Sequence, residues 1–236
     1  MPVSIGREGC WLESKQQKEI KNIRYFIVEN AKSARNALKM VDLAAPVQEL
    51  KLLQLNKYNQ EDKNRLLSFL EEGERVGLLS EAGLPCVADP GGAVVRLAAE
   101  HGFTIKPLVG PSSLMLALMA SGGNGQRFTF RGYLPFSAQE RSKALMDMKR
   151  ALLKDQETQI LIETPYRNLA LAELLRQSLP GHIMLTLALN LTHGDRERIQ
   201  THFLVDWATR YPWPFQGKEP CVFVLSTVSY THLRAH

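Results

Sequence analysis

Strand-like and helix-like segments alternate along the whole sequence, and this alternation limits the possible folds more than any other feature. Apolar, β-prone stretches are separated by stretches whose apolar side chains have helical spacing. The predicted strands are residues 23–28, 50–55, 76–79, 104–109, 128–133, 159–162, 183–189, 199–204 and 221–225. The predicted helices are residues 31–40, 64–72, 93–100, 112–121, 139–153 and 169–178. Such alternation predicts an α/β fold with parallel or mixed sheets covered by helices.

The order of the elements also predicts a division into two domains. The chain ends in strands with little helix between them, which indicates a second sheet of different topology. The best linker is the glycine-rich stretch at residues 121–126. We therefore expect an N-terminal α/β domain over residues 1–121 and a C-terminal α/β domain over residues 126–227. Residues 228–236 read as a translated sequencing-library adapter and are left out of the fold prediction.

Composition and cysteine spacing exclude several classes of protein. The longest strictly apolar run, residues 114–120, is too short to cross a bilayer, and no secretory signal opens the sequence, so we expect a cytoplasmic protein. Cys10, Cys86 and Cys221 are odd in number and show no ligand spacing, which predicts reduced thiols and no bound metal. The net charge of +5 is compatible with a nucleic-acid partner without requiring one.

Three segments share a pattern in which a strand is followed by a capping-type residue, a proline and a helix. They are centred on Pro90, Pro111 and Pro165, and Asp89 and Thr164 are good N-cap residues. Capping alone explains each segment. Together they are expected at the carboxyl ends of strands, the edge where open α/β sheets bind ligands.

The loop at residues 80–92 is the segment richest in candidate functional groups. It is long for a connection between a strand and a helix, and it carries Glu81, Asp89 and three glycines. Loops of this kind in compact domains are usually functional, and this one is too apolar for disorder. Glycines here permit either close approach to a ligand or simple turn geometry.

Other motifs give no support to alternative chemistries. The glycines at residues 122–125 lack the dinucleotide-binding spacing, and neither a phosphate-binding Walker loop nor a GxSxG nucleophile motif occurs. The histidines have ordinary surface contexts. Five basic residues fall on one predicted helix, as either a solvated face or an RNA-facing patch, and the sequence leaves both interpretations open. They are Arg141, Lys143, Lys149, Arg150 and Lys154.

Four segments resemble motifs of the tetrapyrrole methylase superfamily, whose members use S-adenosylmethionine. Residues 79–91 match S-[DE]-A-G-x-P followed by DPG, and residues 109–113 match a PGPS-type segment. Residues 130–135 match G-[FY]-L-P and residues 163–167 match E-[ST]-P-[HY]-R. The motifs occur in order over roughly residues 2–225, and the nearest branch is the one that methylates small-subunit ribosomal RNA.

The resemblance implies two α/β domains with a cofactor cleft between them, a homodimer, S-adenosylmethionine as cofactor and no metal. It implies a methyltransferase that methylates the 2′-oxygen of a ribosomal RNA cytidine. Glu81 or Glu163 would serve as general base toward a ribose hydroxyl. Matched position by position, the cofactor-binding residues would be Asp89, Gly91, Gly92, Ser113, Leu114, Glu163, Thr164, Leu189 and Asn190.

The sequence departs from the family pattern in three places. The apolar strand that normally precedes a loop like residues 2–6 is missing, and Glu81 stands where the RNA-modifying branch usually has Asp. The R-E-L-T segment of that branch reads Leu-Asn-Leu-Thr at residues 189–192. The last two departures concern the RNA substrate more than the cofactor. Two alternatives therefore stay open: methylation of a tetrapyrrole-like small molecule, and a non-catalytic module that binds the cofactor or RNA.

Overall fold

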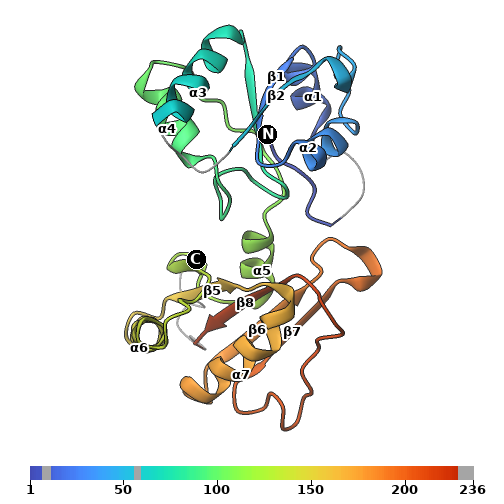
Figure 1. Ribbon diagram of the computed structural model, residues 1–236. Coiled ribbons are helices and arrows are strands. Elements are labelled where there is room, and N and C mark those ends of the chain that lie inside the picture. Colours follow the sequence, from blue (N-terminus) through green and yellow to red (C-terminus); the bar gives the residue numbers. More distant parts are fainter. Residues whose placement is uncertain (7–11, 56–59, 228–236) are drawn as a thin grey trace, which may run out of the picture. The chain divides into compact units, whose positions relative to one another are not determined.

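The computed structural model describes residues 1–6, 12–55 and 60–227, which form two compact units (Figure 1). The first unit is Met1–Ser112 and the second begins at Ser113. Each unit has its own β-sheet with helices packed against it. The predicted α/β class is confirmed.

The first unit contains a three-stranded parallel sheet in the order β2-β1-β3. Its strands are β1 (Tyr25–Val28), β2 (Lys51–Gln54) and β3 (Val76–Leu79). Its helices are α1 (Ser14–Ile20), α2 (Ala31–Leu38), α3 (Gln60–Glu72) and α4 (Gly92–Glu100), with the 3-10 helix η1 (Val47–Glu49) before β2.

Alternate side chains of the central strand β1 divide the first unit's core into two layers. Phe26 and Val28 bury one face of the sheet against α1 and α2, in a cluster that includes Leu38. Ile27 points to the other face, where Leu66 of α3 and Val94 of α4 cover it. Because side chains alternate along a strand, one buried strand thus anchors helices on both sides of the sheet. Figure 1 shows the two helix pairs on opposite sides.

The second unit contains a five-stranded mixed sheet in the order β4-β5-β8-β6-β7. Only β4 and β5 pair in parallel, and the other neighbours are antiparallel. Its strands are β4 (Phe128–Gly132), β5 (Thr158–Ile162), β6 (Met184–Leu189), β7 (Arg198–Phe203) and β8 (Cys221–Ser226). Its helices are α5 (Ser113–Ser121), α6 (Ala138–Lys154) and α7 (Asn168–Ser178), with the 3-10 helices η2 (Pro165–Arg167) and η3 (Gly194–Arg196).

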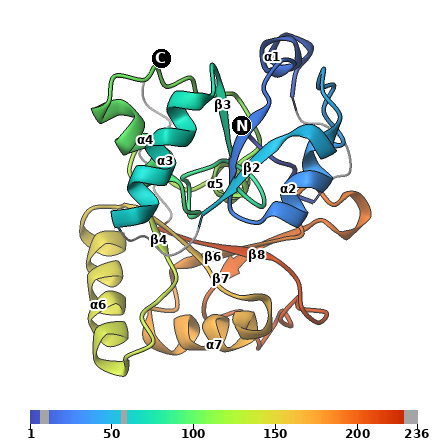
Figure 2. The same ribbon diagram turned by 45° about the horizontal axis from the view of Figure 1, so that its top comes forward.

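The central strand β8 is buried along its whole length, and its two faces pack against different helices. Phe223 lies in a cluster with Met148 of α6 and Leu175 of α7, and Val224 lies in a cluster with Leu118 of α5. Figures 1 and 2 show α5 on one side of this sheet and α6 and α7 on the other. A continuous apolar run is typical of a strand covered on both faces.

Two elements differ from the sequence predictions for local reasons. Residues 104–109 do not form a strand, because Pro107 lacks an N–H for pairing and the segment is largely exposed. The helix α1 was not predicted, because its polar sequence has no apolar periodicity. Most other predicted elements form within a few residues of their expected bounds.

The helix α5 was predicted as the end of the first domain, and in the structure it packs on the sheet of the second unit. Its Leu114, Ala117 and Leu118 are buried against β5, β6 and β8. The stretch after it, residues 122–127, connects α5 to β4 within that unit. The domain ranges 1–121 and 126–227 stay a prediction.

The structure tests the expectations about membrane spans and cysteines only over the residues that it describes. Among the described residues, no helix combines the length and apolarity needed to span a membrane. Cys86 and Cys221 are free thiols. Cys10 and the predicted adapter tail at residues 228–236 lie outside the described residues.

Candidate functional site

The carboxyl ends of β1 and β3 bring acidic residues together in the first unit. The last residues of the two strands, Val28 and Leu79, are paired in register. The chain therefore continues side by side into Glu29 after β1 and into Ser80 and Glu81 after β3. Parallel neighbours deliver their following loops to the same sheet edge, which is where open α/β sheets bind ligands.

We call Glu29, Glu81 and Asp89 the carboxylate rim of the first unit. Burial and then the charge of Asp89 raise the pKa of Glu29, although a hydrogen bond from the backbone of Glu81 opposes the change. Burial, opposed by a hydrogen bond with Ser80, raises the pKa of Asp89, and the charge of Glu81 raises it further. Within the described residues, none of the three carboxylates forms an ion pair.

The oxygens of the rim are only partly satisfied. Ser33 donates its hydroxyl to Glu81 at 2.9 Å. The Oε2 atom of Glu29 is buried and has no hydrogen-bond partner among the described residues. Buried acceptors without a donor are uncommon and costly, and bound ligands are one way to satisfy them.

The loop at residues 80–92 holds several residues at positive φ. Cys86 and Ala88 have φ of 69° and 67°, a region that side-chain-bearing residues rarely adopt. Gly91 has φ of 128°, and a Cβ atom there would lie 3.1 Å from Leu78 and 3.2 Å from Cys86. Strained backbone of this kind clusters at functional sites.

The start of α4 differs from the sequence prediction. Asp89 and Pro90 were expected as N-cap and first helical residue, whereas the helix begins at Gly92 with Gly91 as its N-cap. The positive φ of Gly91 lets the chain turn before the helix starts, so Asp89 is displaced into the loop. A Cβ atom on Gly92 would have nothing within 4 Å, so the space beside this helix start is open.

In the second unit, Glu163 and Thr164 follow β5 and precede η2, with Thr164 as its N-cap and Pro165 at its first position as predicted. The buried carboxylate of Glu163 accepts hydrogen bonds from the backbone N–H of Thr164 at 2.7 Å and from its hydroxyl at 3.1 Å. It also forms an ion pair with Arg167 at 3.5 Å. Glu163 therefore fixes the shape of its own loop.

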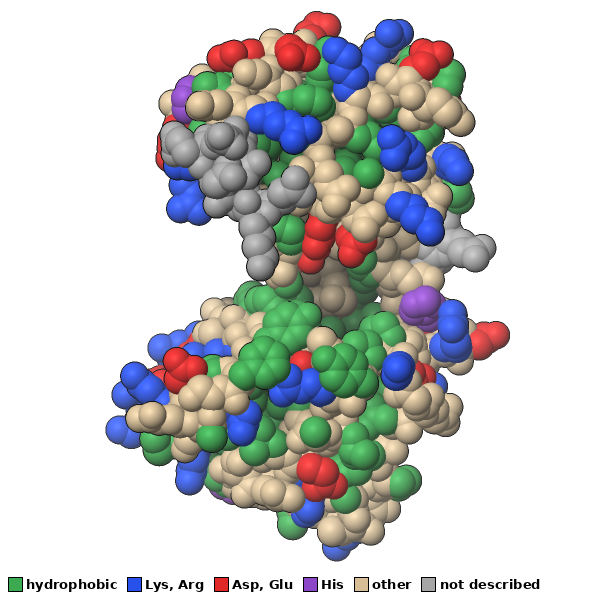
Figure 3. Space-filling view, viewed as in Figure 1, with side chains coloured by type: hydrophobic (Ala, Val, Ile, Leu, Met, Phe, Trp, Pro, Cys, Tyr) green, Lys and Arg blue, Asp and Glu red, His purple; other side chains and the backbone are tan. Residues whose placement is uncertain are grey.

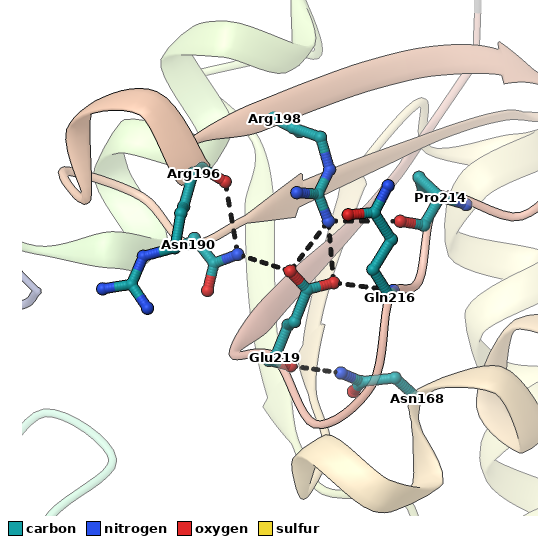
Figure 4. A network of polar contacts seen from close by, with 7 residues as sticks. All are labelled: Asn168, Asn190, Arg196, Arg198, Pro214, Gln216 and Glu219. Atoms are coloured by element: carbon teal, nitrogen blue, oxygen red, sulfur yellow. Dashed lines mark hydrogen bonds and ion pairs between the residues drawn. The ribbon is translucent and has the colours of Figure 1, made fainter.

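Leu189 and Asn190 lie at the end of β6, beside a polar network centred on Glu219 (Figure 4). Asn190 has φ of 49° and donates to Glu219 at 2.8 Å and to the carbonyl of Arg196 at 3.2 Å. Arg198 donates to both oxygens of Glu219, at 2.8 and 2.7 Å. The amide of Asn190 is thus used to hold the loop together.

Burial raises the pKa of Glu219, but hydrogen bonds outweigh this effect. The N–H of Gln216, the guanidinium of Arg198 and the amide of Asn190 all stabilise the carboxylate, so the pKa is lowered overall. The side-chain amide of nearby Asn168 donates to the carbonyl of Glu219 at 2.7 Å. The network ties β6, β7 and the segment before β8 to the start of α7.

The remaining predicted site residues, Ser113 and Leu114, open helix α5. The side chain of Leu114 is buried in the core against the second sheet, and Leu189 is fully buried. These two leucines therefore have only backbone groups to offer a ligand. The preceding Gly110 and Pro111 follow a segment without regular secondary structure instead of the predicted strand.

The structure groups the predicted residues of each unit separately. Glu81, Asp89, Gly91 and Gly92 share the edge of the first sheet, and the remaining predicted residues belong to the second unit. Sequence reasoning missed Glu29, although its position directly after a predicted buried strand was a usable signal. It also missed the pair of Arg198 and Glu219, which no local pattern connects. In the described ranges, no group of three or more His, Cys, Asp or Glu is arranged to hold a metal ion.

Proteins named "Ribosomal RNA small subunit methyltransferase I" are similar to this chain in sequence. The protein of Xylella fastidiosa is 32% identical over 164 residues, which are 69% of this chain and 56% of that protein. The protein of Bacillus subtilis (strain 168) is 30% identical over 149 residues, which are 63% of this chain and 48% of that protein. The chain thus spans about half the length of the curated relatives that it matches. No protein-family model matches the chain.

Solved structures with a similar fold are also methyltransferases. The methyltransferase CobJ aligns with a TM-score of 0.59 at 17% identity, covering 92% of this chain and 89% of that one. Uroporphyrin-III C-methyltransferase from Thermus thermophilus, complexed with S-adenyl homocysteine, aligns with a TM-score of 0.53 at 17% identity, covering 92% and 91%. The predicted resemblance is thus matched in sequence by proteins named as ribosomal RNA methyltransferases and in fold by solved methyltransferase structures.

Proposed function

We propose that this chain is an S-adenosylmethionine-dependent methyltransferase that methylates the 2′-oxygen of a cytidine in small-subunit ribosomal RNA. The observation that carries the proposal is its similarity, at 30–32% identity, to proteins named as ribosomal RNA methyltransferases. The proposal includes a cytoplasmic location and a homodimer. Fold similarity to methyltransferases supports the transfer chemistry in general but does not choose the acceptor.

The carboxylate rim fits the cofactor chemically. S-adenosylmethionine carries an ammonium group, a sulfonium centre and ribose hydroxyls, which are cations and hydrogen-bond donors. The three carboxylates of the rim form no ion pairs among the described residues. One buried acceptor, Glu29 Oε2, has no hydrogen-bond donor among them. Asp89, Gly91 and Gly92 would hold the cofactor there, and the open space at Gly92 supports close approach to the backbone.

When bound, the cofactor supplies an electrophilic methyl group for in-line displacement. The protein's contribution is to orient the acceptor and to exclude water. Glu81 is exposed and accepts one hydrogen bond, from Ser33, so it is available to take a proton from a ribose hydroxyl. The carboxylate of Glu163 is engaged with Thr164 and Arg167, so we assign it a positioning role. The cofactor contacts predicted for the second unit remain part of the proposal.

Methylation of a small tetrapyrrole-like acceptor is the second candidate, favoured by the uroporphyrin methyltransferase among the structural neighbours. Affinity for RNA should fall steeply with salt because binding releases counterions. A small acceptor, even one with several carboxylates, has no condensed counterions to release, so its affinity should fall less steeply with salt. A salt titration of acceptor binding separates the two candidates.

Calorimetric titration with S-adenosylmethionine tests the cofactor assignment. We expect the wild-type chain to bind, Asp89→Ala to lose most of the affinity, and the matched variant Glu100→Ala to bind normally. Glu100 is an exposed acid at the opposite end of α4. A folded wild-type chain, shown by a cooperative melt, that does not bind the cofactor would refute the proposed function.

A further inference from the structure

Three large aromatic side chains of the second unit are exposed on two segments that come into contact with each other. The exposed fractions are 54% for Tyr133, 80% for Phe136 and 70% for Tyr166. Tyr133 and Phe136 lie between β4 and α6, and Tyr166 lies in η2. Single exposed apolar residues are ordinary, but aromatic rings gathered at one place indicate an interaction surface.

Contacts with two arginines join these segments. The guanidinium of Arg167, next to Tyr166, stacks over the ring of Phe136 at 4.7 Å from its centroid. Arg141 of α6 donates to the carbonyl of Phe136 at 3.1 Å. We call Tyr133, Phe136, Tyr166 and Arg167 the aromatic patch. Figure 3 shows hydrophobic side chains gathered around basic ones on a face of the second unit.

The buried carboxylate of Glu163 fixes the conformation of part of the patch. Glu163, whose side chain is only 6% exposed, forms an ion pair with Nε of Arg167 at 3.5 Å. The same carboxylate accepts from Thr164, so it fixes the loop that carries Tyr166 and Arg167. A guanidinium oriented in this way offers a flat face, as an aromatic ring does, and loses little freedom when a ligand stacks on it.

The helix α6, which begins two residues after Phe136, is basic. From residue 138 to residue 154, α6 carries five Lys or Arg and two acidic residues. None of the five basic side chains forms an ion pair within the part of the chain that the structure describes. A helix of this length extends about 25 Å, which is enough to follow several phosphates of an extended strand.

We propose that the aromatic patch stacks unpaired bases of single-stranded RNA while basic side chains of α6 contact the phosphates. The inference rests on the proposed function, for which it names the acceptor-binding surface. Aromatic rings combined with a positive groove or face are the usual means of binding single strands, because every base has a face that can stack. Of the two interpretations of the basic helix that the sequence left open, the proposal takes the RNA-facing patch.

Fluorescence anisotropy with a labelled single-stranded oligoribonucleotide rich in cytidine tests the proposal. We expect Phe136→Ala and Tyr166→Ala each to raise the Kd about 5- to 100-fold. Phe136→Tyr, which keeps a stacking ring, should bind within about twofold of wild type, whereas Phe136→Leu, which keeps only apolar area, should bind like the alanine variant. The matched control is Phe203→Ala, an exposed aromatic on β7 outside the patch, and it should leave the Kd unchanged.

The outcomes separate this proposal from the function on which it rests. Wild-type Kd values for both patch variants, or a wild-type chain that does not bind the oligonucleotide, would overturn the proposal. So would Phe136→Ala that leaves RNA affinity intact and converts a dimer to a monomer by sedimentation, because the patch would then bind a second copy of the chain. Each variant is also titrated with S-adenosylmethionine. Failure of the wild type to bind the cofactor would refute the proposed function, and the anisotropy would still decide whether the patch binds RNA.

Discussion

The two units treat acidic residues at their sheet edges in opposite ways. In the first unit, the three carboxylates of the rim have no ion pair among the described residues, and burial raises the pKa of Glu29 and Asp89. In the second unit, Glu163 and Glu219 each face an arginine and accept several hydrogen bonds. Carboxylates at the two sheet edges therefore differ in their partners: Glu163 and Glu219 are paired with arginines, and the carboxylates of the rim are not paired among the described residues.

The difference identifies which edge has capacity left for a ligand. A paired carboxylate mainly fixes the shape of its loop, since its oxygens are already satisfied. An unpaired, partly buried carboxylate destabilises the folded state, and a cation or hydroxyl group that binds there removes that cost. In the proposed function, the unpaired carboxylates of the first unit would attract the cofactor, whereas the paired carboxylates of the second unit fix the shape of their loops.

Breaking the Glu219 network should have the largest effect on stability. Glu219→Ala leaves Arg198 without its carboxylate and removes one of the two acceptors of the Asn190 amide, so we expect a loss of about 2–4 kcal/mol in the free energy of unfolding. Urea titration followed by the fluorescence of Trp207 and Trp213, which both lie in the second unit, measures it. The nearby exposed variant Asp195→Ala should change stability by less than about 0.5 kcal/mol.

The same pair predicts a pH dependence with a defined sign. Because the pKa of Glu219 is lowered in the folded state, its contribution is present above the unfolded pKa and is lost as the pH falls through the folded pKa. The difference between wild type and Glu219→Ala should therefore shrink on acidification. A difference that stays constant down to low pH would contradict the ionic nature of the network.

Neighbouring glycines in the first unit offer a matched pair with a smaller effect. Gly91→Ala places a Cβ atom at φ of 128° and 3.1 Å from Leu78, so we expect a loss of about 1–3 kcal/mol. Gly92→Ala adds a methyl group in open space at the first turn of α4, so it should be neutral or slightly stabilising. Thermal melts of both variants decide the point. Equal melting temperatures would show that the turn before α4 does not need a glycine.

The sequence predicted elements well where an apolar pattern was long or fully buried. Residues 139–153 and 183–189 match α6 and β6 to within one residue at each end, because core packing and local pattern agree. The pattern failed at residues 104–109, where β-prone side chains surround a proline that cannot pair. It also failed at α1, whose stability comes from tertiary contacts of Ile20 instead of local periodicity.

The part of the candidate site that directly follows predicted strands could be predicted from the sequence. Loops after β3 and β5 were expected to carry the polar groups, and both do. The ring contact between Phe136 and Arg167 and the pair of Arg198 and Glu219 were not predictable, because their partners are separated by 31 and 21 residues. Burial and hydrogen bonding of Glu219 depend on the register of the second sheet, which sequence spacing alone does not determine.

The smallest effect, and the most direct test of the contrast between the units, comes from neutralising Glu29. Burial and the charge of Asp89 raise its pKa, so the folded state binds its proton more tightly than the unfolded state does. Its ionised form therefore destabilises the folded state near neutral pH, and this penalty is relieved as the pH falls through the raised folded pKa. Glu29→Gln also places an amide donor among carboxylates. We expect the melting temperature of Glu29→Gln to lie about 1–3 °C above that of the wild type at pH 7. The expected rise is small because solvent screens the charge of a partly exposed side chain.

The gain from Glu29→Gln should shrink toward pH 4, because the wild-type side chain then takes up a proton and becomes neutral itself. Differential scanning fluorimetry across that range measures the change, with Glu100→Gln as the control for an exposed acid. If the cofactor uses the rim, the stabilised variant should bind S-adenosylmethionine more weakly, since stability and binding draw on the same unpaired charge. A variant that melts below the wild type at pH 7 would mean that Glu29 is already satisfied, and the contrast between the two units would lose its physical basis.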